Sequence, residues 1–109
     1  MVKSRTQIRR IVDDYKAELK RHNIKVSQII LYGSYARGNP RYCSDIDLVV
    51  VSSDFKKFHS LKRQELLAEL TMDIDAPLEV IGYTPQELRR SKDTIFGQIL
   101  KETGKVLRG

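Results

Sequence analysis

Residues 29–38 read IILYGSYARG and residues 44–51 read SDIDLVVV, and these two stretches decide the fold of the chain. Each contains an apolar run rich in β-branched residues, which predicts two strands. The pair Gly33-Ser34 then falls at the end of the first strand, and the aspartates fall inside the second. Because side chains alternate along a strand, Asp45 and Asp47 are expected on one face, with Ile46 directed into the core.

This arrangement predicts a site for phosphate and divalent metal. Two carboxylates that share a face repel each other unless a cation lies between them, and Mg²⁺ prefers such oxygen ligands. Gly33 allows the backbone to leave the strand and a ligand to approach closely. Ser34 is expected to cap a short turn, whose amide groups would favour an anion. We expect the outer phosphates of a nucleotide here, with two metal ions that neutralise charge in the transition state.

The order of these residues resembles a known family. Gly33-Ser34, ten intervening residues and then Asp45-x-Asp47 resemble the nucleotidyltransferase superfamily typified by DNA polymerase beta. In its short length and its motif Gly-Ser-x-Ala-Arg-Gly, the chain resembles the minimal branch of this superfamily, the MNT antitoxins that are paired with HEPN toxins. The resemblance is strong over residues 32–51 and weaker over 77–83 and 104–107. It implies an α/β (α+β) fold, the mixed β-sheet of the nucleotidyltransferase palm covered by helices.

The resemblance also implies a third carboxylate from a later strand. Asp73, Asp75 and Glu79 are the candidates, and Glu79 is favoured because it lies inside the apolar run 78–83. Glu79 would share the metal with Asp45 and Asp47 and would accept the proton of an acceptor hydroxyl. The expected catalytic and metal-binding residues are Asp45, Asp47 and Glu79, and the expected nucleotide-binding residues are Gly33, Ser34 and Arg37. Arg37 could instead pair with an aspartate or cap the loop, and these alternatives stay open.

The remaining pattern predicts helices that alternate with strands. Ser4 and Gln7 form a capping box for a first helix that ends near residues 22–23, and residues 84–87 give a second helix start with proline in its first turn. Strands are expected at 26–32, 45–51 and 78–83, and further helices at 53–71 and 94–102. The expected inward residues of those two helices are Phe55, Phe58, Leu61, Leu66, Leu67 and Leu70, and then Ile95, Phe96, Ile99 and Leu100. Such alternation is typical of a helix-covered α/β sheet.

Size and composition narrow the class of protein. The chain has 109 residues, which predicts a single domain over 1–109 with one core. It shows no signal-peptide pattern or long apolar span, and its one cysteine, Cys43, fits a reducing compartment, so a cytoplasmic protein is expected. The tyrosines at 32, 35 and 42 fit half-buried packing better than base stacking.

The net charge of +6 is spread unevenly along the chain. Residues 1–25 hold eight basic and three acidic residues, whereas residues 26–84, which contain the expected site, hold six basic and eight acidic residues. Basic flanks could attract a nucleotide or an acidic partner, or they could be solvated helix faces. No aromatic-basic motif accompanies them, so direct nucleic-acid binding is not expected.

Two classes of function follow. In the first, the chain is an enzyme that transfers AMP from ATP to a hydroxyl acceptor with Mg²⁺. The MNT resemblance implies a protein acceptor, a HEPN ribonuclease toxin that becomes inactive on receiving AMP, so the chain would be an antitoxin in a homo- or hetero-oligomer. In the second, the chain is a binding module that neutralises its partner by covering it. Transfer to a small molecule or an RNA end is a further alternative.

Overall fold

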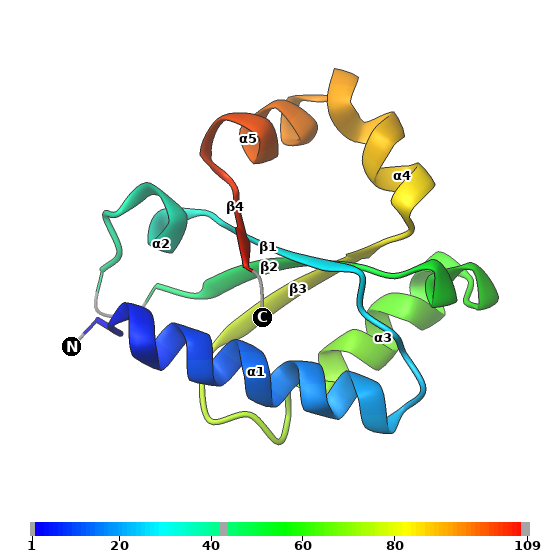
Figure 1. Ribbon diagram of the computed structural model, residues 1–109, viewed down its shortest axis with the longest axis horizontal. Coiled ribbons are helices and arrows are strands. Elements are labelled where there is room, and N and C mark those ends of the chain that lie inside the picture. Colours follow the sequence, from blue (N-terminus) through cyan, green and yellow to red (C-terminus); the bar gives the residue numbers. More distant parts are fainter. Residues whose placement is uncertain (1, 42–43, 108–109) are drawn as a thin grey trace.

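Four strands form one mixed sheet, described here from a computed structural model that covers residues 2–41 and 44–107. The strands are β1 (Gln28–Tyr32), β2 (Ile46–Val51), β3 (Leu78–Tyr83) and β4 (Lys105–Leu107), in the order β3-β2-β1-β4 (Figure 1). β1 runs antiparallel to β2 and β4, and β2 runs parallel to β3. The expected mixed sheet is therefore confirmed, and β3 and β4 are its two edges.

Helices cover both faces of this sheet. The first layer consists of α1 (Arg5–Arg21) and α3 (Ser60–Leu70), and the second of α4 (Pro85–Arg90) and α5 (Ile95–Thr103) (Figure 1). Short turns complete the chain: α2 (Ser34–Arg37), η1 (Ser53–Lys57) and η2 (Ser91–Asp93). Among the described residues, no helix is both long and apolar enough to cross a membrane.

The alternation of side chains along β2 divides the core in two. Ile46, Leu48 and Val50 belong to the larger cluster, which α1 and α3 close. Val49 and Val51 belong to the smaller cluster, which includes Leu100 of α5. Asp47 lies on the same face as Val49, because the two residues are separated by one position. The α4–α5 side of the sheet is therefore the side that carries the expected site.

The two helix starts are confirmed by their caps. Ser4 and Gln7 bond reciprocally at the start of α1, and Thr84 and Glu87 do so at the start of α4. Each pair satisfies backbone amide groups that the first turn of a helix leaves without a partner. The strand starts differ slightly, because β1 begins at Gln28 and β2 begins at Ile46, which leaves Asp45 just ahead of the strand.

The helix expected over 53–71 is two pieces. The 3₁₀ turn η1 ends at Lys57, and the next residue, Phe58, is extended, with a φ of −115° and a ψ of 131°; α3 begins two residues after Phe58. Leu61 was wrongly expected to face inward, because its position in the first turn of α3 leaves it 64% exposed.

The rotation of α5 also differs from the expectation. Phe96 and Leu100 face the sheet, whereas Ile95 is 83% and Ile99 39% exposed. A nine-residue helix that rests on one side buries only a narrow stripe, so four inward residues could not all be accommodated. Strand β4 was not predicted, since three residues are too few to show a period.

Candidate functional site

Asp47 lies at the centre of the candidate site, between two neighbouring strands. It is paired in register with Tyr32 of β1 on one side and with Glu79 of β3 on the other. Paired residues in a sheet present their side chains on the same face, so these three side chains form a row across the sheet. Asp47 is half-buried, and Glu79 and Asp45 are exposed.

The electrostatics show that these groups act on one another. Burial raises the pKa of Asp47 above its ordinary value, the charges of Asp45 and Glu79 raise it further, and the positive charge of Arg37 partly opposes them. An acidic group with a raised pKa at such a position is typical of a functional site. The structure therefore brings together Asp45, Asp47, Glu79 and Arg37, all four of them predicted from the sequence.

The charges of Asp47 and Glu79 also act on Tyr32. Burial raises its pKa to about 12, and Asp47, Glu79 and Tyr83 contribute to the rise. Its ring packs edge to face on Phe96, with ring centroids 5.1 Å apart, and Phe96 also contacts Tyr83 at 6.4 Å. Phe96 thus joins α5 to the wall of the site. Sequence analysis placed Phe96 inward but could not find this contact, because it joins segments that are far apart along the chain.

Gly33 forms a tight approach between the backbone and Asp47. Its φ of 77° and ψ of −156° belong to a region that only glycine adopts readily. A Cβ atom at this position would collide with Oδ2 of Asp47. Gly33 thus holds the backbone of the β1–α2 turn directly against the carboxylate, as a phosphate cradle beside a metal ligand requires.

Ser34 has a different local role from the one expected. Gly33 is the N-cap of α2, and Ser34 is the first residue of the helix. The amide groups of the first helical residues have no carbonyl partner within their own helix, so the start of α2 still offers donors to a ligand. Ser34 is half-buried and directly follows Gly33, the residue whose backbone lies against the Asp47 carboxylate.

Asp73 and Asp75 lie elsewhere. They belong to the turn before β3 and line a hollow together with Glu18, Arg21 and His22, at the end of α1. This hollow lies toward the α1–α3 side of the sheet, whereas Asp47 faces the α4–α5 side. Of the three candidates for a third carboxylate, Glu79 is the one placed beside Asp47. Tyr42 and Cys43 lie outside the described residues.

The donor atoms suit a hard cation, but they are not gathered tightly. Asp45, Asp47 and Glu79 offer only carboxylate oxygens, the ligands that Mg²⁺ prefers. Within residues 2–41 and 44–107, no three acidic, histidine or cysteine side chains converge closely enough to enclose a metal ion by themselves. The carboxylates are thus neighbours on an open face, where further oxygen ligands from a substrate would have room.

Comparison with known proteins gives matches over most of the chain. The family described as "Polymerase beta, Nucleotidyltransferase" matches residues 14–107. MJ1215, a candidate protein adenylyltransferase of Methanocaldococcus jannaschii, is 41% identical over 64 residues, which cover 56% of this chain and 73% of that protein. The protein adenylyltransferase MntA of Shewanella oneidensis is 32% identical over 93 residues, covering 84% of this chain and 61% of MntA. The chain therefore spans less than two thirds of the length of MntA.

Solved structures also match this chain over most of its length. A crystal structure of a toxin-antitoxin with AMP-PNP superposes with a TM-score of 0.63 and 29% identity, over 89% of this chain and 72% of the other. A structure of a tri-AMPylated Shewanella oneidensis HEPN toxin in complex with an MNT antitoxin gives a TM-score of 0.53 and 27% identity, over 91% of this chain and 72% of the other.

Proposed function

The chain belongs to the polymerase beta nucleotidyltransferase family, and from this premise we propose that it transfers AMP from ATP to a hydroxyl group of a partner protein. The observation that carries the proposal is the row formed by Asp47 and Glu79 beside Gly33, with Asp45 and Arg37 close enough to shift the pKa of Asp47. Similarity to MntA and MJ1215 supports adenylyl transfer to protein as the reaction.

Each residue of the site has a role in this proposal. The backbone at Gly33 and Ser34 would hold the outer phosphates, with Arg37 beside them. Asp45, Asp47 and Glu79 would hold Mg²⁺, which supplies charge neutralisation to the triphosphate. The acceptor oxygen attacks the α-phosphorus in line as the bond to pyrophosphate breaks, and Glu79 takes the proton of the hydroxyl. Because Glu79 is exposed, an acceptor on another molecule can reach it.

The proposed acceptor is a HEPN toxin. The support is the structure of an AMPylated HEPN toxin with an MNT antitoxin, which this chain resembles over most of its described length. A hydroxyl of a second protein can reach the site, because Asp45 and Glu79 are exposed.

Labelling with ATP tests the reaction. The purified chain is incubated with its cognate HEPN toxin, Mg²⁺ and ATP labelled on the α-phosphate, and label is expected on the toxin. Asp47→Asn is expected to lower labelling by about 100-fold or more, because a neutral amide cannot replace a carboxylate ligand. Asp73→Asn is the matched control and is expected to keep full labelling, because Asp73 lies by the end of α1. A toxin that binds the wild-type chain and stays unlabelled would reject adenylyl transfer.

We keep the binding module as a second candidate. The MNT antitoxin of the solved complex lies bound to its HEPN toxin, and neutralisation by covering would need such contact alone. The double variant Asp45→Ala, Asp47→Ala separates the two functions. If the folded double variant still neutralises the toxin fully in cells, covering rather than catalysis is the mechanism, and loss of neutralisation supports catalysis.

A further inference from the structure

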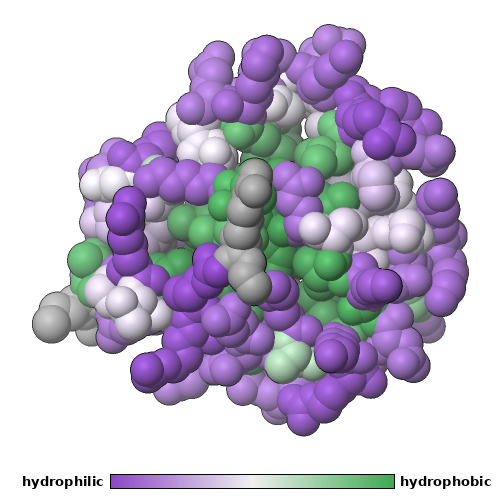
Figure 2. Space-filling model, in the orientation of Figure 1, coloured by the Kyte–Doolittle hydropathy of each residue, from purple (hydrophilic) through white to green (hydrophobic). Residues whose placement is uncertain are grey.

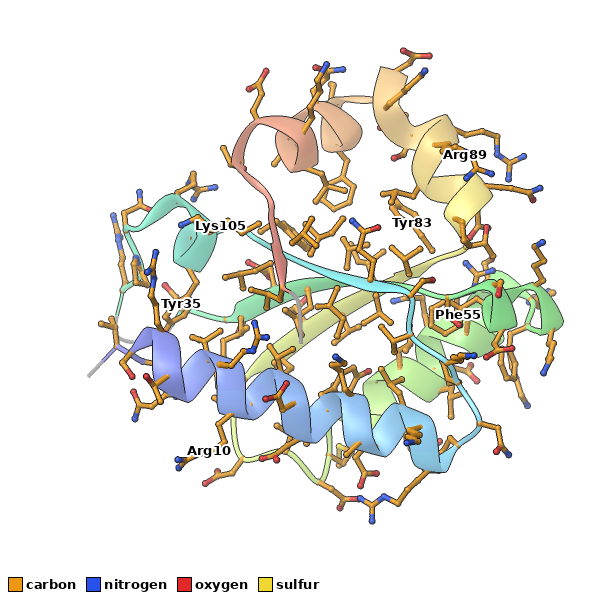
Figure 3. The ribbon with its side chains drawn as sticks, viewed as in Figure 1. Arg10, Tyr35, Phe55, Tyr83, Arg89 and Lys105 are labelled. Atoms are coloured by element: carbon orange, nitrogen blue, oxygen red, sulfur yellow. The ribbon has the colours of Figure 1, made fainter. Side chains whose placement is uncertain are left out.

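A groove with basic walls lies on the side of the sheet away from Asp47. It is bounded by the first half of α1, by β4 and by the turn after α2, with Tyr35, Arg10 and Lys105 around it (Figure 3). Its floor is apolar and comes from Ile8, Leu31 and Leu107. Figure 2, which shows α1 and α5 on either side of β4, has hydrophobic residues between the two helices and a hydrophilic rim around them. A concave apolar surface with a charged rim is typical of a binding site for another molecule.

The two edge strands of the sheet, β3 and β4, differ in whether side chains of the chain itself bond their backbone. At β3 the edge is covered from within the chain, since Gln64 bonds Val80 O at 3.1 Å and Gly82 N at 3.2 Å, and Arg63 bonds Gly82 O at 3.0 Å. At β4 no side chain of the described residues bonds the backbone, and Val106 is 46% exposed. An open strand edge is a template for pairing with an extended segment. The groove therefore offers backbone pairing along one wall.

The two arginines at the start of α1, Arg5 and Arg9, lower the stability of this helix. The first turn of α1 holds Arg5 and no acidic residue, although the positive end of the helix dipole favours acidic side chains there. Arg9 follows at the i+4 position, where a second positive charge repels the first. Neither arginine forms an ion pair with a carboxylate of residues 2–41 or 44–107. The two arginines are therefore available to an external anionic group.

The charges in the groove select one kind of occupant. One end of the groove is positively charged and suits carboxylates of a ligand, because it is lined by Arg5, Arg9 and Lys105. Further along α1 the groove is negatively charged, because Asp13 and Asp14 line it there. A nucleic acid presents phosphates at every step and would be repelled at that end, whereas a peptide can place acidic residues at one end only. The apolar floor likewise suits aliphatic side chains of an extended peptide rather than stacked bases.

We propose that this groove binds an extended acidic segment of the acceptor protein, laid along the free edge of β4; the identity of that protein rests on the proposed function. Tyr35 and Gly38, which line the groove, belong to the segment that continues from Gly33 and Ser34. The docked segment thus contacts the turn that forms the phosphate cradle while the acceptor hydroxyl approaches from the α5 side. Binding and catalysis use opposite faces of the sheet.

Charge reversal tests the groove. Binding of the purified cognate HEPN toxin is measured by biolayer interferometry on the full chain. Arg5→Glu with Arg9→Glu is expected to weaken the Kd by at least about tenfold, and the milder Arg5→Gln with Arg9→Gln by about threefold. Arg89→Glu with Arg90→Glu, which reverses two exposed arginines of α4, is the matched control and is expected to change the Kd by less than about twofold. Raising NaCl from about 50 to 300 mM should weaken only the groove-dependent part of the binding.

Two further readouts separate docking from folding and from chemistry. Arg5→Glu alone should leave Tm unchanged or slightly higher, since a glutamate in the first turn suits the helix dipole. Asp47→Asn should bind the toxin like the wild-type chain while losing AMP transfer. If the wild-type chain itself binds the toxin and transfers no AMP, the proposed function is rejected and the groove assignment still stands.

The assignment is overturned by any of three results. These are a groove variant that binds the toxin like the wild-type chain, a control variant that is weakened equally, or a wild-type chain that does not bind the toxin. A single-stranded RNA of about 20 nucleotides serves as the competing ligand. RNA binding that the groove variant abolishes, with toxin binding unchanged, would assign the groove to nucleic acid and also overturn the proposal.

Discussion

Asp47 carries a cost that the fold does not relieve. Burial and the charges of Asp45 and Glu79 all disfavour its ionised form, and Arg37 offsets only part of this effect. A protein selected for stability alone would place a neutral residue there, since the rest of the strand is apolar. The cost is consistent with a position kept for a bound cation and phosphate, which would stabilise the ionised carboxylate.

Gly33 and Gly38 form a matched pair for testing the close approach to Asp47. Both have positive φ, 77° and 80°, but only a Cβ at Gly33 meets Asp47, and nothing lies within 4 Å of one at Gly38. We expect Gly33→Ala to cost about 2–3 kcal/mol of unfolding free energy and to abolish Mg²⁺-dependent ATP binding. Gly38→Ala should cost about 1 kcal/mol and retain ATP binding. Urea unfolding and calorimetry measure the two effects, and equal loss of ATP binding in both variants would contradict the role given to Gly33.

At the scale of elements, Arg63 joins helices from opposite sides of the sheet. Its guanidinium donates to Gly82 O and Phe55 O, both at 3.0 Å, and to Glu87 at 2.6 Å. It also lies over the ring of Phe55, 5.4 Å from the centroid. Glu87 in turn accepts the amide of Thr84 at 2.7 Å. The start of α4 is thereby fixed to α3 around the edge strand β3, which sets the position of the layer above the site.

The Arg63–Glu87 pair predicts a pH-dependent contribution to stability. Burial alone would raise the pKa of Glu87, but the hydrogen bonds from Arg63 and Thr84 outweigh it and lower the pKa. A lowered acidic pKa stabilises the fold above the unfolded pKa of about 4.3, and this stability is lost as pH falls through the folded value. Glu87→Gln should therefore cost about 1–2 kcal/mol near pH 7 and much less near pH 3.5, measured by urea unfolding.

A control isolates this effect from a general loss of charge. Glu65 lies exposed on α3 and forms no ion pair within the described part of the chain. Glu65→Gln should change stability by less than about 0.5 kcal/mol at either pH. A difference between wild type and Glu87→Gln that stays constant across this pH range would show that the hydrogen bonds, and not the charge, provide the stability.

The elements show how far local sequence signals reach. Capping boxes predicted the starts of α1 and α4 because both halves of each signal lie within four residues. The register that sets Glu79 beside Asp47 could not be derived in the same way, since it depends on how two distant strands align. The rotation of α5 was missed for a related reason. Buried Gly97 packs so closely on the backbone of Ser91 that a Cβ would not fit, and this contact fixes which side of α5 faces the sheet.

At the scale of the whole molecule, the two faces of the sheet are unequal. Of the residues that the structure describes, fourteen buried ones belong to the cluster under α1 and α3, and four to the cluster under α5. Buried apolar area is the main source of local stability, so the α4–α5 layer should open more readily than the α1–α3 layer. We therefore expect the proposed site to lie on the side that opens more readily, where its carboxylates could move together around a substrate, and the groove to lie on the side that opens less readily.

Hydrogen exchange measured by mass spectrometry tests this asymmetry. Amides of α4 and α5 should exchange about tenfold or more faster than those of α1, β1 and β2, which corresponds to an opening free energy at least about 1.4 kcal/mol lower. Leu100→Ala removes the buried contact of α5 and should accelerate exchange in that layer alone, while Leu19→Ala in α1 should lower the protection of the whole molecule.

Binding of a ligand gives a second readout of the same asymmetry. Mg²⁺ with a non-hydrolysable ATP analogue should slow exchange in α2 and α5 of the wild-type chain, because the proposed ligand would contact both the Gly33–Ser34 turn and the α4–α5 layer. Uniform protection across both layers would mean that the sheet and all its helices open as one unit, and the carboxylates would then have to bind metal in the spread arrangement observed.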